Sequence, residues 1–172
     1  NDPEIIGSPY YFSSLRLKSS IWFGGENQIL RYAEDHFKKY PAPNFGSIHQ
    51  IIAYSDSLLF CVSDRATFFF EINTGAVEEF TLENTLVNQA VIFNGILWLS
   101  GDSGVWKYTG NRGEKIYPEN KNRSIPCHQL TAINGVIYFL SGEEGLMQIN
   151  NGKILKILPL TEFPSRKISF MK

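Results

Sequence analysis

An apolar triplet with an aromatic residue in the middle occurs four times along this chain. The middle residues are Trp22, Phe60, Trp98 and Tyr138, and successive ones are 38, 38 and 40 residues apart. Regular self-similarity at this period is typical of proteins built from stacked supersecondary units. Because such a unit cannot bury its apolar faces alone, it must pack against its neighbours in the chain.

Turn signals divide each repeat into four short segments. Asn94-Gly95 and Asn134-Gly135 precede two of the triplets, and Asn-Gly favours a two-residue hairpin because a type I′ turn needs positive φ at both positions. Further clusters of Gly, Ser, Asp and Asn follow each triplet. The best helical candidate, residues 31–40, is short and ends at Pro41. Each repeat is therefore predicted to be a four-stranded antiparallel meander.

Four-stranded units of this length are typical of β-propeller blades. We predict an all-β chain that forms one domain over residues 1–172. Four blades are expected, at residues 14–41, 48–82, 88–118 and 128–159. Residues 160–172 would begin a further blade, with Ser165 to Met171 as its inner strand, and Tyr10-Tyr11-Phe12 would be an unpaired or a closing strand. Four blades can close a ring, but larger rings are commoner, so an incomplete ring is the alternative.

Composition excludes several classes of partner. The net charge is −1 and the sequence pI is about 6.3, and no basic stripe is visible, so we expect no nucleic acid. No run of 18 apolar residues occurs, so we expect no membrane contact by this segment. The chain lacks an initiator Met and a signal peptide, which indicates a piece of a longer protein.

Cys61 and Cys127 have no metal-ligand spacing and are expected to be free and buried, with a disulfide as the alternative.

The first repeat resembles the two-component regulator propeller repeat, whose core reads roughly Leu-Trp-Ile-Gly-Thr, a polar turn, then Gly-Leu-x-Arg-Tyr. The matching residues of the first repeat are Ile21, Trp22, Phe23, Gly24, Leu30, Arg31 and Tyr32. The third repeat keeps Leu97, Trp98, Gly101, Gly104, Val105 and Tyr108. The fourth keeps Ile137, Gly142, Gly145 and Leu146. The second repeat departs most, because its turn lacks the glycines.

The resemblance implies a periplasmic sensing region of a membrane-bound histidine kinase, often of the hybrid type found in Bacteroidetes that respond to glycans. In that family a sandwich domain, a membrane helix and the kinase follow the propellers, and this chain contains none of them. The resemblance thus implies the fold and a signalling role for the parent protein, with no enzymatic activity in this chain.

Polar pairs recur where each repeat enters its innermost strand. His49-Gln50, Asn88-Gln89 and His128-Gln129 hold equivalent positions, with Gln-to-Gln spacings of 39 and 40. In a propeller these residues would lie near one mouth of the central channel. Amides and imidazoles there can hydrogen-bond sugar hydroxyls, so all six are candidate ligand-binding residues. The structural alternative is that they satisfy backbone groups at the junctions between blades.

Other chemistry receives less support. Gly24-Gly25 resembles a phosphate-binding loop, but neither a Gly-Lys-Ser/Thr sequence nor a helix follows, so we expect the glycines to form a turn. His49 and His128 lack a third metal ligand, and we predict no metal site, no cofactor and no catalytic residue. Exposed aromatics could stack on a sugar, and the candidates are Tyr10, Tyr11, Phe45 and Tyr117. Carboxylates recur at one turn position, which favours a turn role over the paired acids of a glycosidase, and these are Asp64, Asp102, Glu143 and Glu144.

These observations predict a non-catalytic, periplasmic or extracellular sensor or binding module of a two-component signalling protein. It would recognise a glycan or relay dimer geometry. The expected partners are an oligosaccharide and either a second copy or the remaining blades of a parent chain. The alternative is a protein-interaction scaffold with no small ligand, and an enzyme such as a propeller lyase or glycosidase comes third.

Overall fold

The computed structural model describes residues 10–83, 85–110 and 112–162, which form four sheets of four strands each. The first two sheets contain β1 (Tyr11–Leu17), β2 (Ser20–Gly25), β3 (Gln28–Ala33), β4 (His36–Pro41), β5 (Ile48–Ala53), β6 (Leu58–Ser63), β7 (Thr67–Glu71) and β8 (Val77–Phe80). The other two contain β9 (Val87–Phe93), β10 (Ile96–Gly101), β11 (Gly104–Thr109), β12 (Arg112–Tyr117), β13 (Cys127–Ile133), β14 (Val136–Ser141), β15 (Gly145–Asn150) and β16 (Lys153–Pro159). A 3₁₀ turn, η1 (Leu160–Glu162), follows β16.

Within each sheet the strands lie side by side in chain order and pair antiparallel. The predicted all-β fold with four meanders is therefore confirmed. Both Asn-Gly hairpins have the expected backbone, with φ values of 52° and 72° at Asn94 and Gly95 and of 49° and 81° at Asn134 and Gly135. The first sheet begins at Tyr11, earlier than the predicted start at residue 14, and it includes Tyr11 and Phe12 in a paired strand.

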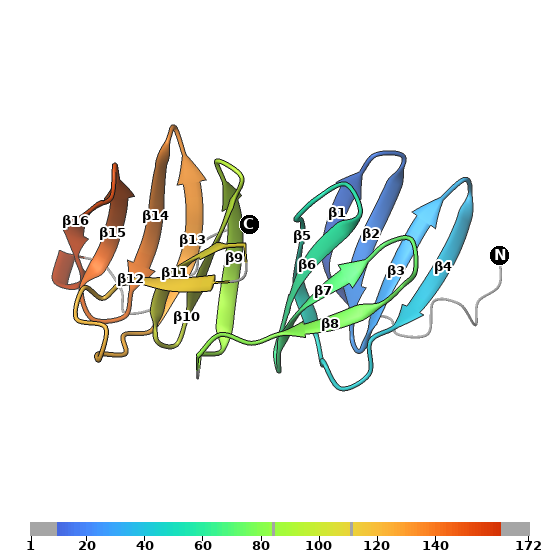
Figure 1. Ribbon diagram of the computed structural model, residues 1–172, viewed down its shortest axis with the longest axis horizontal. Coiled ribbons are helices and arrows are strands. Elements are labelled where there is room, and N and C mark those ends of the chain that lie inside the picture. Colours follow the sequence, from blue (N-terminus) through green and yellow to red (C-terminus); the bar gives the residue numbers. More distant parts are fainter. Residues whose placement is uncertain (1–9, 84, 111, 163–172) are drawn as a thin grey trace.

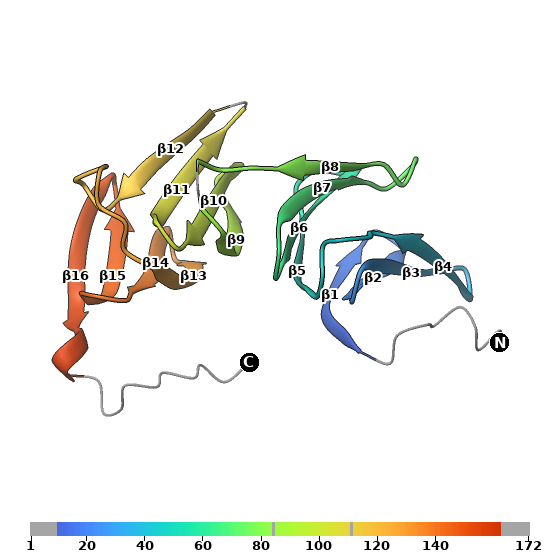
Figure 2. The ribbon, with the colours of Figure 1, turned by 90° about the horizontal axis from the view of Figure 1, so that it is seen from below.

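The four sheets are arranged as consecutive propeller blades (Figures 1 and 2). The innermost strands are β1, β5, β9 and β13, and each contacts the next one along the chain. The described blades form an arc, with the first and the fourth blade at its two ends (Figure 2). Of the two predicted alternatives, the described residues show the open ring. The segment from Ser165 to Met171, predicted to start another blade, lies outside the described residues.

Each pair of neighbouring blades shares one hydrophobic core. Trp22 of the first blade packs with Phe68 and Phe70 of the second. Phe60 of the second blade belongs to the core shared with the third, and Trp98 of the third to the core shared with the fourth. The aromatic residue that defines the repeat is therefore a contact between blades, which explains why it must recur once per blade.

Gly24 and Gly25, which follow the first apolar triplet, are the last two residues of strand β2. A side chain at Gly24 would lie 2.6 Å from the carbonyl oxygen of Ile48 in the next blade. Real Cβ atoms do not approach that closely, so glycine is required because the inner strand of the second blade passes against it. The prediction that these glycines form a turn is wrong: both pair with β3 inside β2, and the positive φ of the turn, 54°, belongs to Asn27.

Both cysteines are buried and free, as predicted. Burial raises the pKa of the Cys61 thiol, and burial also raises the pKa of Cys127, to about 12.

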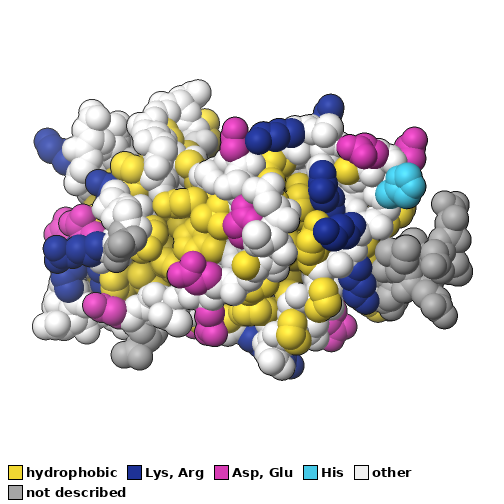
Figure 3. Space-filling model, turned by 45° about the vertical axis from the view of Figure 1, so that its right-hand side comes forward, with side chains coloured by type: hydrophobic (Ala, Val, Ile, Leu, Met, Phe, Trp, Pro, Cys, Tyr) yellow, Lys and Arg dark blue, Asp and Glu magenta, His cyan; other side chains and the backbone are white. Residues whose placement is uncertain are grey.

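On the face drawn in Figure 3, Lys and Arg side chains lie among Asp and Glu side chains, with hydrophobic side chains exposed between them. Among the described residues no helix is long and apolar enough to cross a membrane.

Candidate functional site

The three predicted polar pairs lie at the start of the inner strands β5, β9 and β13. In the second and third blades a β-bulge interrupts the pairing with the second strand here. It leaves His49 and Asn88 without a cross-strand partner, whereas Gln50 pairs with Val62 and Gln89 with Ser100. Because a bulge changes which face a side chain points to, the two members of each pair have different surroundings.

The glutamines join neighbouring blades. The side-chain amide of Gln50 donates to the carbonyl oxygen of Ala90 at 2.8 Å, and its oxygen accepts from the N–H of Ala90 at 2.8 Å. The side-chain oxygen of Gln89 accepts from the N–H of Leu130 at 3.0 Å. Gln50 and Gln89 thus take the backbone-satisfying role that was the structural alternative for these residues. Their part in binding a ligand stays a prediction.

The bulged residues His49 and Asn88 form a row across the inner strands with His128, which is not bulged and pairs with Leu140. His49 Nε2 lies 3.2 Å from the carbonyl oxygen of Asn88 and must donate, since a carbonyl only accepts. Asn88 Nδ2 lies 3.3 Å from His128 Nδ1 and donates to Asp102 Oδ1 at 3.1 Å. Asp64 Oδ1 lies 3.6 Å from His49 Nδ1. His49, Asn88 and His128 are therefore brought together, with a turn carboxylate beside each of the first two.

Phe12 extends this row into the first blade. It lies in the bulge of β1, between Tyr11, which pairs with Gly25, and Ser13, which pairs with Gly24. That is the position of His49 and Asn88 in their blades. We call Phe12, His49, Asn88 and His128 the inner-strand row. Phe12 and the two histidines are exposed and Asn88 is half-buried, so the row presents one aromatic ring and several hydrogen-bonding groups to solvent.

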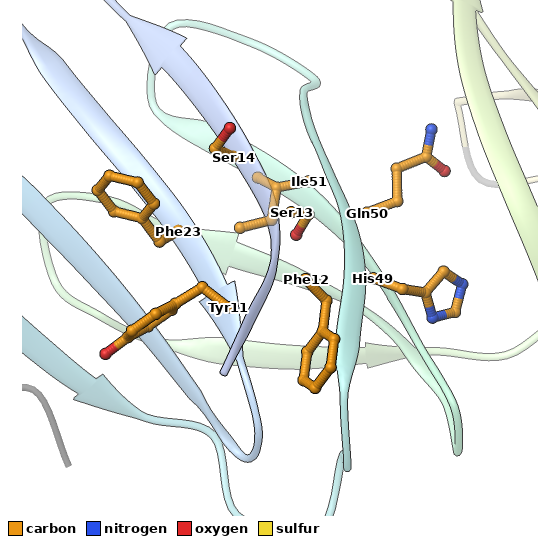
Figure 4. Close-up of a pocket in the computed structure, with 8 residues that line it drawn as sticks. All are labelled: Tyr11, Phe12, Ser13, Ser14, Phe23, His49, Gln50 and Ile51. Atoms are coloured by element: carbon orange, nitrogen blue, oxygen red, sulfur yellow. The ribbon is translucent and has the colours of Figure 1, made fainter. Parts of the chain in front are cut away.

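An open cavity of about 650 Å³ lies at the end of the row formed by the first two blades. It is lined by Tyr11, Phe12, Ser13, Ser14, Phe23, His49, Gln50 and Ile51. Figure 4 shows His49 and Gln50 pointing away from the rings of Tyr11 and Phe23. The Tyr11 and Phe23 rings meet edge to face with centroids 5.9 Å apart, while Ser13 Oγ donates to the carbonyl oxygen of Ile48 at 2.9 Å.

Sequence reasoning missed several of these residues. Phe12 and Phe23 have apolar side chains, and Ser13 belongs to none of the recurring polar pairs, so nothing in their residue types marked them as part of a site. The available signal was the repeat itself, because Phe12 precedes His49 by 37 residues, and the next two steps of the row are 39 and 40 residues. The prediction that Tyr117 is an exposed aromatic is wrong, since Tyr117 is 3% exposed and belongs to the core between the third and fourth blades.

The four recurring carboxylate residues lie in turns or bends, as predicted. The backbone N–H groups of Asp64 and Asp102 donate to the carbonyl oxygens of Ser47 and Leu86, the residue before the inner strand of the same blade. In the part of the chain that the structure describes, no three His, Cys, Asp or Glu side chains gather as a metal site would require. The arrangement is suited to hydrogen-bonding hydroxyl groups, which donate and accept at once.

No protein-family model and no curated protein sequence matches the chain. Solved structures do. The extracellular domain of the one-component system BT4673 of B. thetaiotaomicron aligns with a TM-score of 0.68 at 14% identity, over 85% of this chain and 22% of that chain. The extracellular domain of the hybrid two-component system BT3049 of the same organism aligns with a TM-score of 0.64 at 12% identity, over 82% of this chain and 20% of that one.

A computationally designed protein, Ika4, aligns with a TM-score of 0.61 at 10% identity, over 86% of this chain and 91% of that chain. At these identities the likeness shows the fold alone. The chain spans about a fifth of the length of the two B. thetaiotaomicron domains that it matches. The described residues are therefore four consecutive blades of the β-propeller kind, in an open arc.

Proposed function

We propose that this chain is a non-catalytic sensor module outside the cytoplasm, part of a two-component signalling protein, and that it recognises an oligosaccharide. The sequence resemblance to the two-component regulator propeller repeat supports this. The shared fold with extracellular domains of one-component and hybrid two-component systems also supports it. In this reading the chain forms part of a larger propeller, and a kinase elsewhere in the parent protein supplies the activity.

The observation that carries the proposal is the inner-strand row with the cavity at its Phe12 end. A sugar offers an apolar face of C–H groups and a rim of hydroxyls. Phe12 presents a ring that can stack on the former, and His49, Asn88 and Asp102 present donors and acceptors for the latter. Asp64 beside His49 adds an acceptor at the same edge.

Titration calorimetry of the 172-residue protein with a panel of neutral and acidic oligosaccharides tests this. We expect a binder whose affinity falls at least about tenfold in Phe12→Ala, the loss of one stacking contact of about 1.5 kcal/mol. Phe37→Ala is the matched control, because Phe37 on β4 is 40% exposed and lies outside the row. The proposal would be overturned if Phe12→Ala and Phe37→Ala lost the same affinity, or if no oligosaccharide of the panel bound to the protein.

The alternative function is a protein-interaction scaffold. It is favoured by large apolar side chains exposed on the outermost strand of the fourth blade, where Leu155 and Ile157 are 48% and 46% exposed. Sedimentation velocity would then reveal assembly that depends on protein concentration and not on any glycan. An enzymatic role would require turnover that disappears when one carboxylate, such as that of Asp102, is replaced by its amide.

A further inference from the structure

A second cavity, of about 310 Å³, lies between the first two blades, at the opposite end of the strands from the inner-strand row. Its wall includes Lys18 from the turn between β1 and β2, Asp56 from the turn between β5 and β6, and Asn73 from the turn between β7 and β8. Phe12 and His49 of the row lie instead where β1 and β5 begin. Small-molecule sites typically have volumes of about 300–1,000 Å³, so this cavity is a candidate site of its own.

Arg31 on β3 brings a positive charge to the wall of this cavity. Its guanidinium lies over the ring of Trp22, 5.5 Å from the ring centroid, and Trp22 is 1% exposed. Arg31 Nε donates to the hydroxyl oxygen of Ser20 at 2.9 Å, and Ser20 is also buried. The ring and this hydrogen bond hold the guanidinium in place. Its remaining N–H groups, on the two Nη atoms, donate to none of the described residues, so they are available to a ligand.

The residue opposite Arg31 increases the positive charge instead of neutralising it. Arg31 pairs with Lys38 on β4, and like charges directly opposite each other destabilise a sheet. The third blade differs at this point. Lys107, which like Arg31 pairs with the aromatic residue of the second strand, lies opposite Glu114. The first blade therefore carries two adjacent cations where the third blade carries a cation and an anion.

Nearby carboxylates do not neutralise these cations. Asp56 in the cavity wall pairs with Lys18, with Oδ2 and Nζ 3.4 Å apart. Glu71, the last residue of β7, accepts hydrogen bonds within its own turn, from the backbone N–H groups of Asn73 and Thr74 at 2.9 and 2.8 Å. Among the described residues no carboxylate forms an ion pair with the guanidinium in the wall. An anion from solution would supply the missing partner.

We propose that this cavity binds a small hydroxylated carboxylate, of the sugar-acid class, whose carboxylate pairs with the Nη groups of Arg31. The planar fork of a guanidinium matches a carboxylate with two parallel hydrogen bonds. Ser57 and Asn73 in the wall offer a hydroxyl and an amide to the hydroxyl groups of such a ligand. Asp56 repels a second negative charge, which favours a monoanion over phosphate. This site is separate from the inner-strand row and does not depend on the sensory role.

Titration calorimetry of the 172-residue protein with glucuronate at low ionic strength tests the proposal. We expect saturable binding that weakens at least about tenfold in Arg31→Gln, the loss of a hydrogen bond to a charged group. Glucuronamide, in which a neutral amide replaces the carboxylate, should bind the wild-type protein at least about tenfold more weakly for the same reason, and inorganic phosphate should also bind more weakly than glucuronate. Lys107→Gln is the matched control and should leave the affinity unchanged, as should Phe12→Ala.

A second measurement uses the wild-type protein and does not depend on whether a variant folds. Because the guanidinium lies over Trp22, glucuronate should shift the NMR resonance of the Trp22 indole N–H along a saturating curve, and leave those of Trp98 and Trp106 in place. The proposal is wrong if glucuronate moves none of the three indoles or all of them alike. It is equally wrong if Arg31→Gln and Lys107→Gln lose the same affinity, if phosphate binds more tightly than glucuronate, or if Phe12→Ala alone weakens binding.

Discussion

The contact between Gln50 and Ala90 offers the most direct test of how the blades are held together. Replacing Gln50 by Ala removes two hydrogen bonds, both 2.8 Å long, that cross from the second blade to the third. Ala90 is only 2% exposed, so water has poor access to the backbone N–H and C=O groups that lose their partner. An intact neutral hydrogen bond contributes about 1 kcal/mol, and a buried group left unpaired costs about 1–3 kcal/mol.

We therefore expect Gln50→Ala to lower the free energy of unfolding by about 2–4 kcal/mol, a large part of the 5–15 kcal/mol typical of a folded domain. Urea unfolding followed by tryptophan fluorescence measures this, since the chain has 3 Trp residues. With a slope of about 2 kcal/mol per molar urea, the midpoint should fall by about 1–2 M.

Gln148→Ala provides the matched control for this experiment. Gln148 lies on β15 of the fourth blade, is half-buried, and has no hydrogen bond to another described side chain or turn. The same chemical change there should cost less than about 0.5 kcal/mol. If the two variants unfold at the same urea concentration, the contact between Gln50 and Ala90 does not hold the blades together and the reasoning fails.

Three further predictions follow from burial and charge. Trp22→Ala should lower the free energy of unfolding in urea by about 3–5 kcal/mol, because Trp22 is buried in the core between the first two blades. Tyr138→Ala, at the equivalent but half-buried position of the fourth blade, should lower it clearly less. Similar losses of stability in the two variants would contradict the inter-blade role of this aromatic residue. Hydrogen bonds from the backbone N–H of Thr74 lower the pKa of the Glu71 carboxyl despite partial desolvation. Because the pKa of Glu71 is lower in the folded than in the unfolded protein, the ionised carboxylate stabilises the fold above the unfolded pKa of about 4.5, and this stabilisation is lost as pH falls through the folded pKa. Glu71→Gln should therefore reduce the fall in the free energy of unfolding at acid pH. An unchanged dependence of the free energy of unfolding on pH would count against this. Cys61 is buried and its thiol pKa is raised, so at pH 8 it should react with a thiol reagent only after unfolding, and rapid labelling of the native protein would show that the core opens.

Much of the fold could be predicted because the repeat carries one physical requirement per blade. Trp22, Phe60 and Trp98 recur since each must fill the core shared with the next blade. The Asn-Gly hairpins were predictable for a local reason, the need for positive φ at both positions. The beginning of the first blade was harder to place. Tyr11 and Phe12 have none of the polar signature of the later inner strands, so the apolar pattern alone left their pairing open.

At the candidate site the sequence predicted which residue pairs are equivalent but not which way their side chains point. The spacing correctly identified His49-Gln50 and Asn88-Gln89 as equivalent pairs, but it treated both members of each pair alike. The bulge separates them, because inserting one unpaired residue reverses which face of the strand the next side chain occupies. Gln50 consequently reaches the backbone of the following blade, while His49 joins the exposed row. A bulge leaves no local sequence signal at these positions, and its presence depends on how the inner strand meets the second strand. The same geometry places Phe12 in the row, although its side chain shares no chemistry with imidazole or amide. Position in the blade, rather than residue type, therefore determines which side chains can form a site in this chain.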